Sequence, residues 1–191
     1  MGDIFTQSEE LGIEFILLAG GEPFIRKDVL LQAGNHSNII FPIFTNGTKI
    51  DESYIKLLEQ KRNLIPVISI EGHKETDDET REEMMVRLDY LRSKETDMVL
   101  VAFPGYERAT NGCLAAGRGF FHINAYGDAE PCPFSPYSDT NLLKTSLRES
   151  LNSPLFCKLK EKGNLEDEHV GGCVLFEKQE HVQDILKGNT I

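Results

Sequence analysis

The sequence predicts an α/β protein whose first half forms a parallel sheet and whose second half is a smaller α+β region. In residues 13 to 103, apolar runs of strand length alternate with amphipathic segments of helix length, which is typical of right-handed βαβ units. After residue 103, glycine, proline and cysteine become frequent and the apolar runs shorten. We therefore predict two domains, spanning residues 1–103 and 104–191.

The first domain is expected to contain four strands. The runs EFILLA, IIFPIFT, NLIPVISI and DMVLVAF are apolar, and the first two have the pattern of strands buried on both faces. Helices are expected over residues 4–11, 26–34, 51–61 and 77–94, and Asp51 is a favourable residue to cap the third of them.

The second domain is expected to contain a short hairpin and an amphipathic helix. Residues 124–128 (NAYGD) have the composition of a hairpin turn. A helix is predicted over residues 145–161, with a kink or a break at Ser153-Pro154.

Composition excludes several classes of function. The chain has 191 residues, and its 31 acidic residues exceed its 20 basic ones, giving a net charge of -11 that argues against nucleic acid as a partner. No apolar run approaches the roughly 20 residues of a membrane helix, so no membrane association is expected. The N-terminus MGDIFTQSEE lacks the features of a signal peptide, and a cytoplasmic location is expected.

Three of the predicted strands end in similar polar tips. These are Gly20-Gly21-Glu22-Pro23, Thr45-Asn46-Gly47-Thr48 and Ser69-Ile70-Glu71-Gly72. Because ligands of parallel sheets bind at the carboxyl ends of the strands, the tips predict a site for a polar small molecule. The alternative is that the glycines only end strands and begin turns.

In this order and spacing, GGEP, TNG and SIEG resemble the radical S-adenosylmethionine (radical SAM) enzymes. The resemblance implies a partial, open parallel (βα) barrel. It also implies that Gly20, Gly21, Glu22 and Pro23 meet the methionyl amino group of SAM. Asn46, Ser69 and Glu71 would then lie near the ribose and carboxylate of SAM, or near the substrate.

The chain departs from the family pattern in two respects. Radical SAM enzymes bind a catalytic [4Fe-4S] cluster through three closely spaced cysteines upstream of GGEP, and no cysteine precedes Gly20 here. The segment after Gly72 also leads almost directly into what resembles the last barrel helix, so the barrel is expected to be truncated and internally shortened. SAM binding is therefore expected to be weak or lost, and SAM cleavage by this chain alone is not expected.

All four cysteines lie in the second domain, and in a reducing compartment they are expected to be thiols or metal ligands. NGCLAAGRGFFHINAYGDAEPCPF, followed by GGCVLF, resembles the SPASM or twitch-like extensions of radical SAM enzymes, which bind auxiliary iron-sulfur clusters. The resemblance implies that Cys113, Cys132 and Cys173 ligate an auxiliary [4Fe-4S] cluster, with another residue, solvent or a substrate as the fourth ligand. The alternative is three buried free cysteines, and Cys157 is expected to pack within a helix.

Three hypotheses for function follow. The first is a radical SAM/SPASM protein, inactive as this chain, whose family cleaves SAM reductively and modifies a peptide, protein or other substrate. The second is a non-catalytic remnant that binds an iron-sulfur cluster or a peptide. The third is an α/β protein that binds a small molecule and whose cysteines are incidental.

Overall fold

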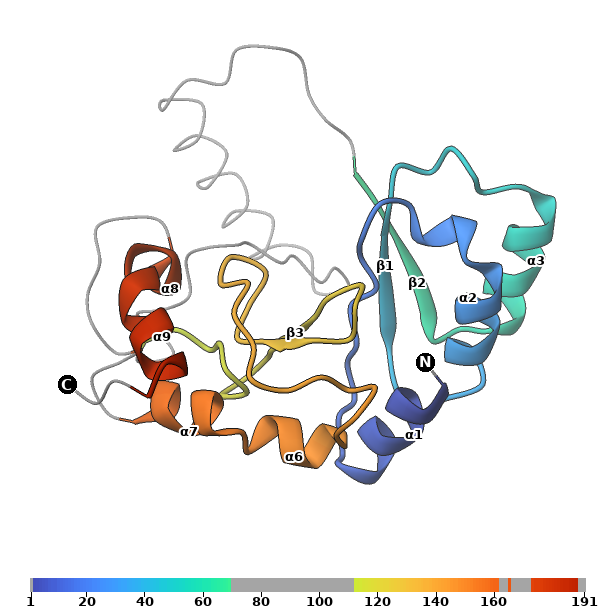
Figure 1. Ribbon diagram of the computed structural model, residues 1–191. Coiled ribbons are helices and arrows are strands. Elements are labelled where there is room, and N and C mark those ends of the chain that lie inside the picture. The colour runs from blue at the N-terminus through green and yellow to red at the C-terminus, as the bar shows by residue number, and fades with distance from the viewer. Residues whose placement is uncertain (1, 70–111, 162–164, 166–172, 189–191) are drawn as a thin grey trace, which may run out of the picture.

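The computed structural model describes residues 2–69, 112–161, 165 and 173–188 (Figure 1). Four expectations lie outside these residues: the helix over 77–94, the fourth strand, the domain boundary and Glu71. None of the helices in the described ranges is long and apolar enough to cross a membrane.

The first half of the chain contains the predicted parallel sheet. Strands β1 (Phe41–Thr45) and β2 (Leu64–Ile68) pair in parallel, with Phe41 opposite Leu64 and Thr45 opposite Ile68. Helix α3 (Glu52–Gln60) connects them, as expected for a βα unit. The parallel direction predicted for these two strands is confirmed.

The segment around residues 15–18 adjoins β1 but is not a continuous strand. Two isolated parallel bridges join Phe15 to Ile40 and Leu18 to Ile43. The expectation that this segment is buried on both faces is wrong, since Phe15 is 52% exposed and Leu17 is 39% exposed. The helices of residues 2–60 pack against the opposite face of the sheet, where Phe41 and Ile43 are fully buried.

The helices of the first half follow the predicted positions. They are α1 (Gly2–Glu10), α2 (Lys27–Ala33) and α3, together with a short 3-10 helix, η1 (Pro23–Ile25). Asp51 caps α3 as predicted, because its carboxylate accepts hydrogen bonds from the backbone N–H groups of Ser53 and Tyr54 at 2.8 and 3.0 Å.

The second half contains the predicted hairpin. Strands β3 (His122–Ile123) and β4 (Ala129–Glu130) pair in antiparallel fashion. In the turn between them, the Asn124 side-chain oxygen accepts hydrogen bonds from the backbone of Tyr126 and Asp128 at 2.9 and 3.1 Å. The Asn124 side chain stabilises the turn through contacts within four residues of the chain. A turn that depends on such local contacts can be predicted from sequence.

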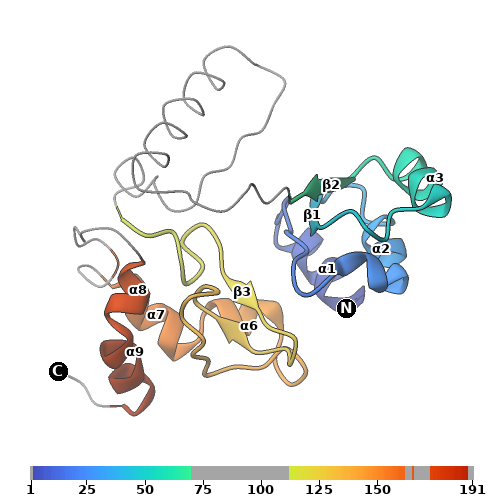
Figure 2. The same cartoon turned by 90° about the horizontal axis from the view of Figure 1, so that it is seen from above.

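The helix predicted over residues 145–161 is split into α6 (Leu147–Leu151) and α7 (Pro154–Lys160). Ser153 caps α7 and Pro154 occupies its first turn. No intrahelical hydrogen bond is lost there, because the N–H groups of the first turn have no acceptor within the helix. Helices α8 (Val174–Glu177) and α9 (Gln179–Leu186) follow, and Figure 2 shows them beside α7.

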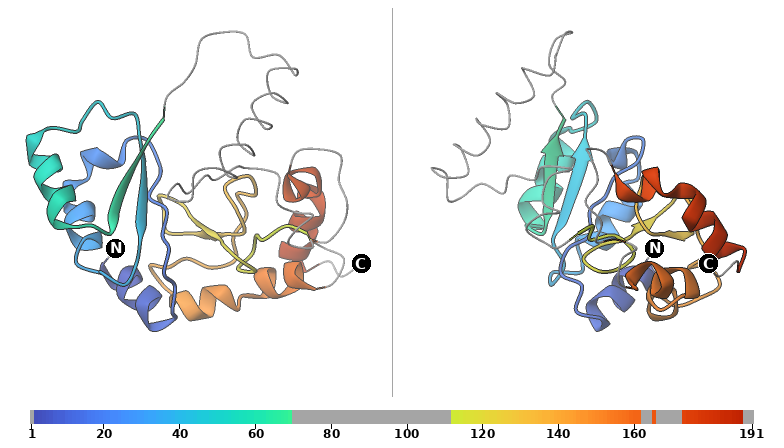
Figure 3. Two further views of the ribbon diagram at one scale, coloured as in Figure 1. Left: turned by 180° about the vertical axis from the view of Figure 1, so that it is seen from behind. Right: turned by 90° about the vertical axis from the view of Figure 1, so that its left-hand side faces the viewer.

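Helix α1 also contacts the second half of the chain. It lies against α6 (Figure 3), and the Gln7 side-chain oxygen accepts a hydrogen bond of 2.7 Å from the backbone N–H of Leu147. This N–H is at the first position of α6, where a helix offers no backbone acceptor. A side chain from the first helix therefore satisfies a donor 140 residues away.

Candidate functional site

The glutamate of GGEP connects two of the predicted strand tips. One oxygen of the Glu22 carboxylate accepts hydrogen bonds from the Thr45 hydroxyl at 2.7 Å and from the Phe24 N–H at 3.1 Å. The other oxygen accepts a hydrogen bond of 3.1 Å from the Asn46 N–H. Glu22 therefore holds the GGEP turn against the end of β1.

These contacts favour the ionised form of Glu22. Partial burial raises the pKa of the carboxyl, but the hydrogen bonds from Thr45, Asn46 and Phe24 outweigh it, and nearby Lys49 adds to their effect. The net pKa is below the usual value. Because both oxygens already have partners, Glu22 acts as a clamp within the chain, and a ligand would meet the adjacent backbone.

Gly20 and Gly21 present that backbone to open space. Both residues are exposed, and a Cβ built on either would meet no described atom within 4 Å. Gly20 has φ +139°, a conformation that side-chain-bearing residues rarely adopt. The glycines therefore permit both the turn and the close approach of a ligand.

The third tip adjoins the other two. The Ser69 N–H donates a hydrogen bond of 2.9 Å to the Thr45 carbonyl, which extends the pairing of β1 and β2 by one residue. Asn46 and Ser69 are both exposed. The structure thus gathers all the described members of the predicted SAM set at one end of the sheet, and we call them the strand-tip site: Gly20, Gly21, Glu22, Pro23, Asn46 and Ser69.

The three cysteines predicted as cluster ligands also meet in space, and we call them the cysteine site. Cys113 and Cys132 are buried in one apolar cluster, and half-buried Cys173 packs against it. The Cys173 and Cys113 side chains are near enough to Cys132 to raise the pKa of its thiol, and none of the three cysteines forms a disulfide. They come from three separate segments, namely the loop before β3, the loop after β4 and the start of α8.

Backbone and side-chain contacts hold the loop of Cys113 in place. Its N–H donates to the Leu165 carbonyl at 2.8 Å, and its carbonyl accepts from the Arg118 guanidinium at 2.9 Å. In the same loop, Ala116 adopts a positive φ of 54° and donates to the Pro131 carbonyl at 3.1 Å. The last contact ties the Cys113 loop to the residue that precedes Cys132.

Burial keeps the Cys132 thiol protonated. Desolvation raises its pKa to about 12, and Cys173 and Cys113 contribute to the rise, whereas a hydrogen bond from the Phe134 N–H to its sulfur opposes it. A thiol must lose its proton to bind a metal, so metal binding here would be coupled to proton release.

The cysteine site does not have the geometry of a site for one ion. Among the described residues, no three or more His, Cys, Asp or Glu side chains converge closely enough to hold a metal ion. A tetrahedral zinc ion bound at 2.3 Å requires sulfurs about 3.8 Å apart. An iron-sulfur core is several atoms wide and is bound by thiolates that are farther apart, so the donor set is compatible with a cluster.

Cys157 does not belong to the cysteine site. It lies on the exposed side of α7, and its sulfur is 3.6 Å from the Asn152 carbonyl to which it donates. The expectation that it packs within the helix is wrong, because Phe156 and Leu159 occupy the buried side. A helix of seven residues buries one face, and in α7 that face carries Leu155, Phe156 and Leu159. Cys157 lies outside this face.

Sequence patterns did not reveal two other polar features of the second half. Buried Glu130 pairs with His122 at 2.7 Å and accepts a hydrogen bond from Asn124 at 2.7 Å, which links the two strands of the hairpin. Ser135 is fully buried, and its hydroxyl has no hydrogen-bond partner in the described part of the chain. The signal that could have indicated Ser135 is its position three residues after Cys132.

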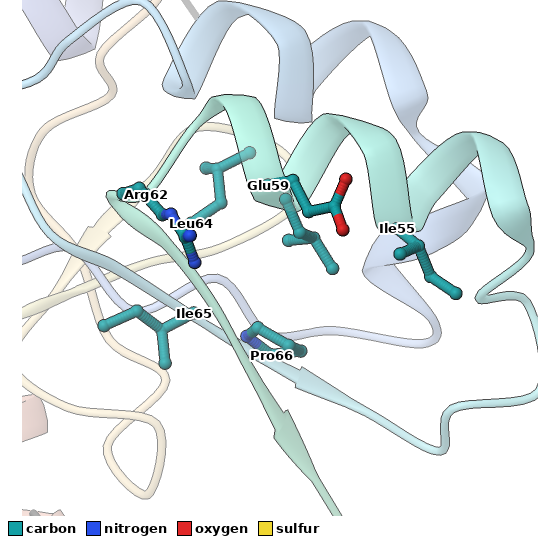
Figure 4. Close-up of a pocket in the computed structure, with 7 residues that line it drawn as sticks. Ile55, Glu59, Arg62, Leu64, Ile65 and Pro66 are labelled. Atoms are coloured by element: carbon teal, nitrogen blue, oxygen red, sulfur yellow. The ribbon is translucent and has the colours of Figure 1, made fainter.

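A groove of about 320 Å³ lies elsewhere, between α3 and the outer side of β2 (Figure 4). No predicted site residue lines it. Its walls are mainly apolar: Ile55, Leu58, Glu59, Arg62, Leu64, Ile65 and Pro66.

Comparison with known proteins supports the fold alone. No family model matches the chain, and no curated protein matches it. The crystal structure of selenomethionine-labelled BtrN, a radical SAM enzyme, in an open conformation superposes with a TM-score of 0.55. The match covers 86% of this chain and 71% of BtrN at 15% sequence identity. The chain has a radical SAM-like fold. At this identity, the similarity does not extend to substrate or to the type of C-terminal domain.

Proposed function

We propose that this protein is a radical SAM/SPASM-type protein that binds an auxiliary [4Fe-4S] cluster through Cys113, Cys132 and Cys173. The observation that carries the proposal is that these three thiols, from separate segments of a radical SAM-like fold, meet at one apolar cluster, where Cys113 and Cys132 are buried and Cys173 packs against them. Thiolates are the usual ligands of iron-sulfur iron, and three cysteines that form no disulfide and lie in one place match that chemistry.

A bound cluster would supply a centre that accepts and donates single electrons. The protein's own residues provide its environment. Burial excludes water from Cys113 and Cys132, and the backbone N–H of Phe134 acts on the Cys132 sulfur so as to lower the pKa of that thiol. Hydrogen bonds of this kind and low exposure are the properties by which proteins adjust cluster potentials.

We also propose that the strand-tip site, with Glu71, is the remnant of a SAM site. The Glu22 clamp positions the open backbone of Gly20 and Gly21, where an ammonium group would bind. Because residues 1–191 contain no cysteine before Cys113, they lack the closely spaced triplet that anchors SAM in the family. Affinity for SAM is therefore weak, and this chain alone does not cleave it.

By its resemblance to the family, the chain would act on a peptide, a protein or another substrate. We propose a cytoplasmic location, with neither nucleic acid nor a membrane as partner, in keeping with the net charge of -11.

Anaerobic reconstitution with iron and sulfide tests the cluster. We expect broad absorbance near about 400 nm from thiolate-to-iron charge transfer. The band should be lost on Cys113→Ala, Cys132→Ala or Cys173→Ala and retained in the control Cys157→Ala, whose thiol is exposed. Protein that takes up stoichiometric zinc but no iron would contradict the proposal, because thiolate sites accept zinc readily.

Calorimetry with SAM tests the strand-tip site. We expect a dissociation constant above about 1 μM, which corresponds to less than about 8 kcal/mol of binding free energy. Tighter binding without iron, or release of 5′-deoxyadenosine, would show that the site is misassigned.

The alternative function is a non-catalytic remnant that binds a cluster or a peptide. Exposed apolar side chains in the segment beside β1, including Phe15 and Leu17, favour it because they are available to a peptide. Cluster uptake without any measurable SAM binding would support this alternative. Failure to bind either group would favour an α/β protein with incidental cysteines.

A further inference from the structure

Ser135 is a buried polar residue that the proposed cysteine ligands leave unexplained. Its side chain is 0% exposed, and its hydroxyl has no hydrogen-bond partner among the described residues. Leaving a buried hydroxyl without a partner has a free-energy cost, so such groups are rare in native proteins. A buried hydroxyl at this position therefore suggests that Ser135 has a partner other than the described protein groups.

The backbone places Ser135 beside Cys132. The two residues close a tight turn, in which the Ser135 N–H donates to the Cys132 carbonyl at 3.0 Å, and they form an antiparallel bridge. Residues opposite each other in such a bridge project to the same face, with Cβ atoms about 4.5–5.5 Å apart. The hydroxyl of Ser135 therefore lies on the face that carries the buried Cys132 thiol.

The spacing of the two residues is also that of cluster ligands. Cys132-Pro133-Phe134-Ser135 has two residues between the cysteine and the serine. C-x2-C is a common spacing for consecutive thiolate ligands of iron-sulfur clusters. Ser135 occupies the position of the second ligand, and three cysteines leave one iron of a cubane without a thiolate.

We propose that the Ser135 oxygen is the fourth protein ligand of the cluster held by Cys113, Cys132 and Cys173. This inference rests on the proposed cluster. When the ligand bond forms, the hydroxyl proton passes to solvent, the oxygen binds iron as an alkoxide, and no electron is transferred. The bond would satisfy the oxygen that is unpartnered in the metal-free chain.

Ser135→Ala, Ser135→Cys and Thr140→Val test the proposal. Thr140 is the matched control, since its hydroxyl is also buried without a described partner, but its backbone carbonyl pairs with the Ala129 N–H, whereas the backbone of Ser135 pairs with Cys132. In the metal-free state, Ser135→Ala and Thr140→Val should melt no lower than wild type, because each removes an unsatisfied hydroxyl.

The full chain and its variants are then reconstituted anaerobically with iron and sulfide. We expect wild type and Thr140→Val to retain about four irons per chain, and Ser135→Ala to lose about one, because the iron without a protein ligand is labile. Added dithiothreitol should change the electron paramagnetic resonance spectrum of reduced Ser135→Ala but not that of wild type. Ser135→Cys should retain the full iron content with a shifted spectrum, since thiolate replaces oxygen.

Two results separate this inference from the proposed function. If wild type binds a cluster that requires the three cysteines, but Ser135→Ala has the same iron content and thiol response, Ser135 is not a ligand and the cluster proposal stands. If wild type binds no such cluster, both proposals fail. Should Ser135→Ala not fold, an unshifted spectrum in Ser135→Cys overturns the inference on its own.

Discussion

The Glu22 carboxylate accepts a hydrogen bond of 2.7 Å from the hydroxyl of Thr45, 23 residues later in the chain. The same carboxylate accepts from the Asn46 N–H, so one side chain links the turn after residues 15–18 to the end of β1. A charged acceptor strengthens both hydrogen bonds. The relative position of two tips of the strand-tip site therefore depends on the ionised state of Glu22.

Glu22→Gln should make the chain less stable at neutral pH, because a neutral amide offers only one acceptor atom where the carboxylate has two. The folded-state pKa of Glu22 is below its usual value of 4.5, so the stabilisation is complete above that value and is lost as pH falls through the folded pKa. Urea unfolding at neutral pH and at about pH 3 measures this. The two proteins should differ in free energy of unfolding at the higher pH only; an equal difference at both would show that the charge is irrelevant.

Gly20→Ala and Gly21→Ala should have different effects on folding. Gly20 has φ +139°, so alanine there should cost about 1 kcal/mol or more, whereas Gly21 has no such constraint and no described neighbour within 4 Å of an added Cβ. Thermal melting compares the pair. Both variants should weaken SAM binding, since each places a methyl group where the ligand approaches. Equal melting temperatures would contradict the role assigned to Gly20.

Alkylation of the folded, metal-free protein should modify Cys157 first. Cys157 is exposed, whereas Cys132 is 2% exposed and burial raises its thiol pKa to about 12, so little reactive thiolate is present. Iodoacetamide labelling followed by peptide mass spectrometry gives the order of modification. In urea the four cysteines should react at similar rates, which is the control. Early modification of Cys132 in the native protein would mean that the cysteine site is more open than the structure indicates.

Elements that depend on neighbouring residues were predicted correctly from sequence. The Asp51 cap, the turn that begins at Asn124 and the helix break at Ser153-Pro154 all involve contacts within a few residues. Their energies come from capping, turn and proline geometry, which act over one turn of chain. The parallel pairing of β1 and β2 was also predictable, because the alternation of strand and helix leaves few topologies.

Side-chain environments were harder to predict, because they depend on which surfaces meet. Phe15 and Leu17 have the same apolar character as buried strand residues, yet they are exposed because the helices of residues 2–60 cover the other face of the sheet. Cys157 was expected to be packed for a similar reason, and Phe156 occupies that position instead.

Motif order in the chain was sufficient to predict a radical SAM-like fold, because the fold depends on the succession of strands and turns. The selection of Cys113, Cys132 and Cys173 as cluster ligands stays a prediction. The roles of Glu22 and Ser135 depend on the folded chain. Glu22 is a clamp because packing brings Thr45 within hydrogen-bond distance, and Ser135 is notable because packing removes its hydroxyl from water without supplying a described partner. Both outcomes depend on long-range packing, which desolvates some polar groups and pairs others, and the residue types alone do not specify it.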